Sequence, residues 1–200
     1  MIAILDYGAG NLASVKKAFD VLGAQTVITS DSAVAQTAKK IVLPGVGHFA
    51  ATAALKELGL TDVVRDAIRG GVPFLGICVG MQWLFEGSAE APGATGFGAF
   101  AGSCQRFPQN GLKCPHVGWN ALEIAKQSRL FADVEEQSPF AYFTHSFYAD
   151  AIGATTATAD HGVTFSAAVE ANNIFGVQFH PEKSGALGLK VLRNFLEILC

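Results

Sequence analysis

The chain has 200 residues, of which 50% are hydrophobic and 16% are charged, and its formal net charge is −3. This length suits one α/β domain that buries roughly 70% of the surface of the unfolded chain, so we predict a single domain over residues 1–200. The absence of a Lys/Arg cluster argues against a nucleic-acid-binding protein, and no apolar run approaches the ~18 residues of a membrane span.

In the first half of the chain, patterns typical of strands alternate with patterns typical of helices. Short apolar runs predict strands at Met1–Asp6, Ala24–Ile28, Lys40–Leu43 and Val72–Ile77. Apolar residues at helical spacing predict a helix with Leu12, Val15, Phe19 and Leu22 on one face, and helices over Phe49–Leu58 and Leu60–Arg69. This alternation predicts a flavodoxin-like, doubly wound and mainly parallel sheet with helices on both faces.

The second half of the chain has a different texture. Glu86–Gly98 is rich in Gly, Ala and Pro and is predicted to be a loop. Short strand-like runs without long helices between them predict an added antiparallel sheet. These runs are Phe97–Arg106, Trp119–Ile124, Phe140–Tyr148, Thr155–Ala159, Thr164–Glu170 and Asn173–Gln178. A last helix is predicted to bury Leu187, Val191, Leu192, Phe195 and Leu199.

Cys78 stands between a predicted buried strand and the run Met81–Phe85, which predicts the start of a helix. Gly76 and Gly80 flank it, and a nucleophile elbow needs such small neighbours around its sharp strand-to-helix turn. The N-terminus of a helix also favours a thiolate. Taken alone, the pattern fits a reactive nucleophile and a packed strand-end cysteine equally well, since free cysteines are commonly buried.

His180 ends another apolar strand, and Glu182 follows two residues later. In an extended segment these two side chains lie on the same side, so Glu182 can accept a hydrogen bond from one ring nitrogen of His180. The other nitrogen is then free to take the proton of Cys78. Singly, the two residues could be a core histidine and a solvated carboxylate. Together with Cys78, each at a strand end, they predict a catalytic triad.

The segment Pro44–Gly47 follows the predicted strand Lys40–Leu43. Its glycines let the backbone turn N–H groups toward a ligand, as an oxyanion hole requires. Alone it is better explained as an ordinary strand-to-helix turn. Its place at the carboxyl end of a strand parallel to that of Cys78 favours the oxyanion hole, with the N–H groups of Val46 and Val79 as candidates.

Six segments resemble those of class I, triad-type glutamine amidotransferases. They are Asp6–Asn11, Leu43–Gly47, Gly76–Gln82, Pro115–Asn120, Tyr142–Ser146 and Gln178–Ser184. The Asp-Tyr-Gly-x-Gly-Asn start and the Pro-His-x-Gly-Trp-Asn segment are more particular to the glutaminase subunits of imidazole glycerol phosphate synthases. The resemblance spans the first strand to the last helix, and it implies one class I amidotransferase domain with the fold of that family.

The resemblance implies an activity and a partner. A glutaminase of this kind hydrolyses L-glutamine to glutamate and ammonia through a cysteinyl thioester. Its ammonia passes through a tunnel to a (β/α)8-barrel cyclase subunit in a heterodimer. That partner makes imidazole glycerol phosphate and aminoimidazole carboxamide ribotide, in a step of histidine biosynthesis. No cofactor or metal is implied for the glutaminase, and the scattered residues His48, His116, His145 and His161 show no ligand-like spacing.

The resemblance also assigns roles residue by residue. Residues expected to hold glutamine are Gly47, Gln82, Ser146 and Phe147, and Asn11 and Lys183 are expected at the partner face. Trp119, in its Gly-Trp-Asn context, fits a core residue by base rate or an exposed anchor of the same interface. Two positions depart from the family pattern: Val79 stands where Leu is usual, and Phe147 where Tyr is common. If position 147 contacts glutamine through its backbone, little changes; if the tyrosine hydroxyl matters, the affinity for glutamine falls.

Several alternatives stay open at this point. Asp6–Asn11 fits a tight turn or a partner-facing loop, and it lacks the third glycine of a dinucleotide fingerprint. The rival functions are a stand-alone cysteine hydrolase or peptidase, a non-catalytic binding module, and a paralogous amidotransferase that feeds another synthase. The four cysteines, Cys78, Cys104, Cys114 and Cys200, show no paired spacing and favour reduced thiols in a cytoplasmic protein.

Overall fold

The computed structural model describes residues 1–108, 111–125, 128–135 and 139–199. An eight-stranded sheet lies at its centre, in the order β2-β1-β3-β4-β13-β12-β11-β8. The first five strands of this order are parallel: β2 (Thr26–Thr29), β1 (Ile2–Leu5), β3 (Lys40–Gly45), β4 (Phe74–Cys78) and β13 (Ile174–Val177). The order reverses around β1, as in doubly wound folds. The predicted fold class is therefore confirmed.

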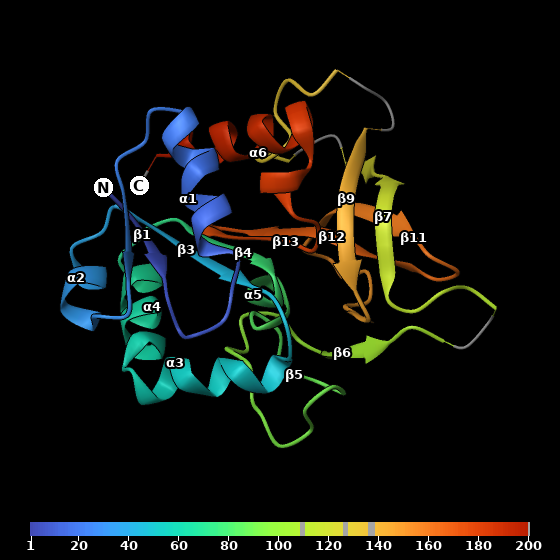
Figure 1. Cartoon of the computed structure of the whole chain (residues 1–200), viewed down its shortest axis with the longest axis horizontal. Helices are drawn as coiled ribbons and strands as arrows, with labels where there is room; N and C mark the ends of the chain where they lie inside the picture. The colour runs from blue at the N-terminus through green and yellow to red at the C-terminus, as the bar shows by residue number, and fades with distance from the viewer. Residues whose placement is uncertain (109–110, 126–127, 136–138, 200) are drawn as a thin grey trace.

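Helices cover both faces of the parallel part of the sheet (Figure 1). One face carries α1 (Leu12–Val21) and α6 (Gly185–Glu197), and the other carries α3 (Ala53–Glu57) and α4 (Leu60–Arg69). The sequence patterns missed α2 (Ser32–Gln36), since five residues are too few to show helical periodicity. Its only local signal is Asp31, whose carboxylate caps the helix by accepting a hydrogen bond from the N–H of Ala33 at 2.8 Å. No helix in the described part of the chain is long and apolar enough to cross a membrane.

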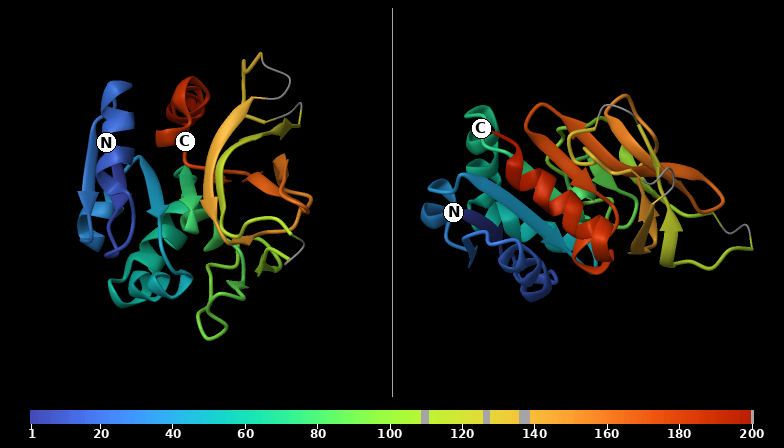
Figure 2. Two further views of the ribbon diagram at one scale, coloured as in Figure 1. Left: turned by 45° about the vertical axis from the view of Figure 1, so that its right-hand side comes forward. Right: turned by 90° about the horizontal axis from the view of Figure 1, so that it is seen from above.

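The predicted antiparallel sheet is divided among three places. Part of it extends the central sheet, as β12 (Thr164–Ala171), β11 (Thr155–Asp160) and β8 (Glu123–Ile124). A separate ribbon pairs β7 (His116–Ala121) with β9 (Phe140–His145), and a small third sheet joins β5 (Gly87–Ser88), β6 (Ser103–Arg106) and β10 (Phe147–Tyr148). Figure 2 shows these yellow and orange strands on the opposite side of the molecule from the blue N-terminal strands.

Two expectations about helices are wrong. Leu199 is 91% exposed and lies beyond the end of α6, because the chain becomes extended at Ile198 (φ −62°, ψ 122°) and leaves the helix. The other apolar residues of α6 face the core as expected, with Leu187 only partly buried. The helix after Cys78 is the single turn α5 (Val79–Gln82), which starts earlier than predicted and ends before Phe85. Two 3₁₀ turns, Phe49–Thr52 and Pro181–Lys183, complete the elements.

Candidate active site

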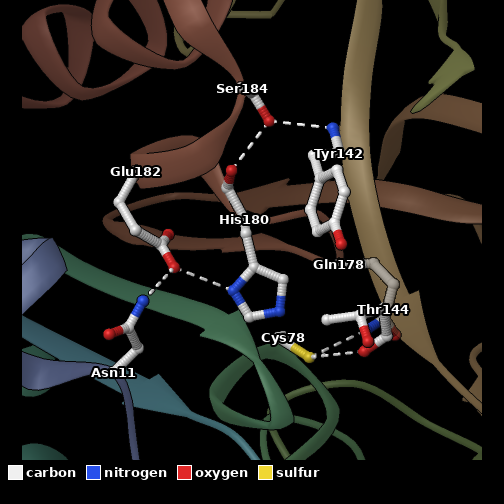
Figure 3. Close-up of polar contacts among 8 residues, drawn as sticks. All are labelled: Asn11, Cys78, Tyr142, Thr144, Gln178, His180, Glu182 and Ser184. Atoms are coloured by element: carbon white, nitrogen blue, oxygen red, sulfur yellow. Dashed lines mark hydrogen bonds and ion pairs between the residues drawn. The ribbon is translucent and has the colours of Figure 1, made fainter. Parts of the chain in front are cut away.

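Three adjacent parallel strands end at the same edge of the central sheet. Gly45 at the end of β3 is the register partner of Cys78 at the end of β4, and Val177 of β13 is the partner of Ile77. The residues that follow these ends are therefore neighbours in space: Val46, Val79 and His180. This is the edge at which ligands bind in open α/β sheets, and Figure 3 shows Cys78, Gln178 and His180 close together there.

Cys78 occupies a strained elbow. Its backbone has φ 55° and ψ −109°, and a positive φ is rare for any residue other than glycine. A Cβ added to Gly76 would lie 2.4 Å from the carbonyl oxygen of Gly80, and one added to Gly80 would lie 1.9 Å from that of Leu43. Only glycine fits at both flanking positions, as the elbow pattern predicts. The one-turn helix α5, however, aligns too few peptide dipoles to favour a thiolate by itself.

His180 and Glu182 form a buried pair. His180 Nδ1 lies 2.9 Å from Glu182 Oε1, and their side chains are 1% and 0% exposed. The same carboxylate oxygen accepts a hydrogen bond from Asn11 Nδ2 at 3.3 Å. Burial lowers the pKa of His180, but the neighbouring Cys78 and Glu182 outweigh burial, and the net pKa is raised. The pair therefore favours a proton on the imidazole.

The free nitrogen of His180 is on the side of Cys78 (Figure 3), and this proximity contributes to the raised pKa of His180. His180 Nε2 is buried and has no hydrogen-bond partner among the described residues. Cys78 Sγ instead lies 4.0 Å from the carbonyl oxygen of Thr144 and 3.6 Å from Gln178 Nε2. Both contacts leave His180 Nε2 without a partner of its own on the side that faces the sulfur.

A pocket of about 130 Å³ opens beside Cys78. Its walls contain both oxyanion candidates and all four residues expected to hold glutamine. The full lining is Val46, Gly47, Cys78, Val79, Gln82, Glu90, Thr144, His145, Ser146 and Phe147. His180 and Glu182 are not part of this lining, which meets them only through Cys78.

Gln82 and Phe147 line the pocket in a way that their types alone do not reveal. Both N–H donors of the Gln82 amide are occupied: Nε2 donates to the carbonyl oxygen of Phe147 at 2.8 Å and to Gln178 Oε1 at 3.0 Å. Only the Gln82 carbonyl oxygen remains for a substrate. Phe147 contributes its backbone to this contact, so the tyrosine hydroxyl that is common at this position in the family has no part in it.

Sequence patterns missed Glu90, the only charged residue among the described residues of the pocket wall. It belongs to the segment Glu86–Gly98, which looks like a plain connecting loop in the sequence. Glu90 Oε2 accepts a hydrogen bond from the N–H of Phe49 at 2.7 Å, and this bond holds the carboxylate in place. No local pattern signals the residue, since only the folding of the loop against Phe49 carries it to the pocket.

The three residues expected at the partner face lie outside the pocket. Trp119 on β7 is 56% exposed and meets the ring of Tyr142 edge-on, with 6.1 Å between centroids. Lys183 Nζ lies 5.8 Å from the centre of the same ring. Asn11 is apart from them, beside Glu182. Trp119 and Lys183 therefore share one surface around Tyr142, whereas Asn11 contacts Glu182 of the buried pair.

The other candidate sites from the sequence show no comparable arrangement of side chains among the described residues. The segment Asp6–Asn11 forms a tight turn in which Asp6 Oδ1 accepts a hydrogen bond from the N–H of Gly8 at 2.9 Å. Gly8 and Gly10 have positive φ angles of 84° and 138°, which explains the glycines. Within the described ranges, no group of three or more His, Cys, Asp or Glu residues is arranged to hold a metal ion. Cys78, Cys104 and Cys114 are free, and Cys200 lies outside the described residues.

Comparisons with known proteins agree with this geometry. The family model of the class-I glutamine amidotransferases matches residues 3–199. The chain is 46% identical to the imidazole glycerol phosphate synthase subunit HisH of Methanothermobacter thermautotrophicus, over 100% of this chain and 99% of that protein. It is 48% identical to HisH of Thermococcus kodakarensis, over 98% of each. A crystal structure of a glutamine amidotransferase is 20% identical and matches the fold with a TM-score of 0.76, over 98% of this chain and 97% of that one.

Proposed function

The chain belongs to the class-I glutamine amidotransferases, among the HisH subunits of imidazole glycerol phosphate synthase, and we propose that Cys78, His180 and Glu182 are its catalytic triad. It is a glutaminase of histidine biosynthesis. The observation that carries the triad is the buried His180 Nε2, which has no hydrogen-bond partner among the described residues and lies on the side of the thiol. Nδ1 of the same ring is held by Glu182 at 2.9 Å.

The proposed mechanism has two halves. Cys78 Sγ attacks the side-chain amide carbon of glutamine while His180 Nε2 takes the thiol proton. The N–H groups of Val46 and Val79 stabilise the negative charge on the amide oxygen in the tetrahedral intermediate. The carbon–nitrogen bond then breaks as His180 returns the proton to the departing nitrogen. Ammonia leaves, and a γ-glutamyl thioester remains on Cys78.

Water completes the reaction. His180 Nε2 takes a proton from the water molecule, and the oxygen of that water attacks the thioester carbon. The carbon–sulfur bond breaks and the sulfur recovers the proton, which releases glutamate. Glu182 takes no proton at any step. It orients the ring through Nδ1 and stabilises the positive charge that the ring carries between the two proton transfers.

Glu90 gives the pocket a site for the α-ammonium group of glutamine. We expect Glu90→Gln to raise KM for glutamine by about 10- to 100-fold, the size of a lost charge-assisted hydrogen bond, with little change in kcat. Steady-state glutaminase kinetics of the complex measure both constants. Glu86→Gln is the matched control, because Glu86 belongs to the same loop and bonds the N–H of Gly102 outside the pocket. An equal rise of KM in both variants would contradict this role.

The partner that we propose is a (β/α)8-barrel cyclase, which docks on the ribbon formed by β7 and β9. Support comes from the relatives, which are subunits of a synthase, and from the ribbon surface. Val117, Trp119 and Phe140 are each 56% exposed on it, and Trp is enriched among the anchor residues of interfaces. Ammonia released in the pocket passes to this partner, where the nucleotide chemistry takes place.

The ribbon is bonded directly to the segment that holds His180. The N–H of His180 donates to the carbonyl oxygen of Tyr142 on β9 at 2.9 Å. Ser184 Oγ bridges the same two residues, since it accepts from the N–H of Tyr142 at 2.9 Å and donates to the carbonyl oxygen of His180 at 2.7 Å (Figure 3). A partner that moves β9 therefore acts on the base of the triad through three hydrogen bonds.

We expect the isolated chain to be a poor glutaminase, and partner binding with a nucleotide ligand to raise its turnover by about 10²- to 10³-fold, the effect of one oxyanion donor. The turn Pro44–Gly47 has the freedom for two backbone states, because Gly47 already has a φ of 92°. Glutamine hydrolysis is measured for the chain alone, for the complex, and for the complex with ligand. Equal turnover in all three would rule out gating and favour a stand-alone hydrolase.

Two further points complete the proposal. The family match over residues 3–199 supports treating the chain as one amidotransferase domain. A cytoplasmic location stays a prediction that rests on the reduced thiols. If glutamine hydrolysis is normal but no barrel cyclase activates it, the partner belongs to another synthase.

A further inference from the structure

The protonated His180 favours a thiolate at Cys78, and an N–H donor that faces the sulfur adds to this stabilisation, whereas the one-turn helix α5 adds little. Besides His180, the sulfur has two hydrogen-bonding neighbours among the described residues, the carbonyl oxygen of Thr144 at 4.0 Å and Gln178 Nε2 at 3.6 Å. A carbonyl oxygen only accepts hydrogen bonds, so it pairs with the neutral thiol. An amide N–H donates, so it pairs with the thiolate. The contact with Thr144 is therefore available only to the neutral thiol, whereas the contact with Gln178 becomes stronger when the sulfur is charged.

The orientation of the Gln178 amide follows from hydrogen-bond chemistry. The side-chain atom of Gln82 that faces the carbonyl oxygen of Phe147 must be its NH₂ group, because two oxygens cannot share this contact. The same NH₂ group faces the Gln178 side chain at 3.0 Å, so the Gln178 atom at that contact must be the oxygen. The NH₂ group of Gln178 is then the end that faces Cys78 Sγ.

Phe147 is itself fixed by a pair of buried histidines. Its carbonyl oxygen accepts a hydrogen bond from His145 Nδ1 at 2.8 Å, which places a proton on that nitrogen. His145 Nε2 is then the acceptor for His116 Nδ1 at 3.0 Å, and His116 Nε2 accepts from Asn120 Nδ2 at 3.2 Å. Burial lowers the pKa of His116 to about 4 and that of His145 to about 3, so both rings are in the neutral form that this arrangement requires.

We propose, on the basis of the triad assigned above, that Gln178 is a positioning residue that stabilises the Cys78 thiolate by donating an N–H to Sγ. Gln82 fixes the direction of this donor, and both amides are buried, at 0% exposure for Gln178 and 2% for Gln82. When His180 takes the thiol proton, the sulfur has no hydrogen left to donate to the carbonyl oxygen of Thr144. It still accepts the hydrogen bond from Gln178. Gln178 therefore acts through Cys78 and touches no substrate.

Gln178→Met tests this role, because methionine has a similar length and no N–H group. Alkylation of Cys78 by iodoacetamide, followed by mass spectrometry across a pH series, reports the thiolate without using glutamine. We expect the rate at neutral pH to fall by about 10-fold or more, as for the loss of a hydrogen bond to a charged group. The pH of half-maximal alkylation moves upward by about one unit. In the glutaminase assay kcat falls while KM changes less than about twofold.

A second variant and a control make the result decisive. Gln178→Glu keeps the oxygen that accepts from Gln82 and replaces the N–H donor with a second oxygen. We therefore expect the pH of half-maximal alkylation to rise more than in Gln178→Met. Gln105→Met removes an exposed amide that, among the described residues, bonds the carbonyl oxygen of Ser103, and it should leave alkylation unchanged. Melting temperatures show that the variants are folded.

The alkylation result stands apart from the proposed function. If the wild-type chain shows no glutaminase activity even with its partner, the triad proposal fails. The alkylation series still tests whether Gln178 stabilises the Cys78 thiolate, because it uses no glutamine. An unchanged alkylation profile in either folded Gln178 variant overturns the role of Gln178, even where glutaminase activity is normal. If Gln178→Met does not fold, the profile of Gln178→Glu decides.

Discussion

Cys78→Ala and Cys78→Ser, assayed in complex with the cyclase, are expected to abolish synthesis from glutamine and to spare synthesis from ammonium salts. Removal of a covalent nucleophile costs roughly 10⁴- to 10⁶-fold in rate, because the thioester route is lost altogether. The cyclase uses ammonia from any source, so its own chemistry remains. Parallel assays with glutamine and with an ammonium salt, on the same preparation, measure the two activities.

Cys104→Ala is the matched control for this experiment. Cys104 is a second fully buried thiol, and burial, reinforced by Asp150 and Glu90, raises its pKa to about 12. It therefore has no thiolate at neutral pH, and its removal should leave glutamine-dependent synthesis intact. Loss of both glutamine- and ammonia-dependent synthesis in a folded Cys78→Ala complex would contradict the division of labour between the two subunits.

His180→Asn is expected to be nearly as damaging as the loss of Cys78, whereas Glu182→Gln is expected to be milder. General base catalysis is worth about 10²- to 10⁴-fold, and asparagine cannot take a proton at neutral pH. Glutamine at position 182 keeps one oxygen for His180 Nδ1 and loses only the negative charge that favours the imidazolium. Values of kcat for glutamine hydrolysis by the complex rank the two variants.

The assignment of Glu182 as the orienting carboxylate can be contradicted separately. Glu90 is a second, partly exposed carboxylate, which lies in the pocket wall, and Glu86→Gln serves again as the control outside the pocket. Suppose that Glu182→Gln has the wild-type kcat, while Glu90→Gln lowers kcat instead of raising KM. Glu182 would then not be the orienting member of the triad. The close contact of Glu182 with His180 at 2.9 Å would then be structural.

The parts of the site that local motifs encode could be predicted from the sequence. Gly76 and Gly80 signal the elbow because no Cβ fits there, and parallel strands that end together bring Cys78 and His180 to one edge. Glu90 and Gln178 could not be predicted in this way. Each reaches the sulfur or the pocket through contacts between distant segments, Glu90 with Phe49 and Gln178 with Gln82.

The fold shows the same limit. Alternation of strand and helix patterns predicts the parallel sheet, because each crossover is local in the chain. The pairing of β7 with β9, apart from the central sheet, depends on contacts such as those of Ser184 with Tyr142 and His180, which no periodicity reveals. Leu199 fits the spacing of α6, but spacing alone does not locate the point at which the helix ends.

The central claim is that ammonia made at Cys78 is delivered to a cyclase partner, and isotope labelling tests it most directly. The complex is supplied with glutamine that carries ¹⁵N in its side-chain amide, together with an excess of unlabelled ammonium salt and the cyclase substrate. Mass spectrometry of the imidazole product then reports the source of its nitrogen. We expect the product to carry ¹⁵N in the wild-type complex and to be unlabelled with Cys78→Ser. Unlabelled product from the wild-type complex, despite active glutamine hydrolysis, would contradict the claim.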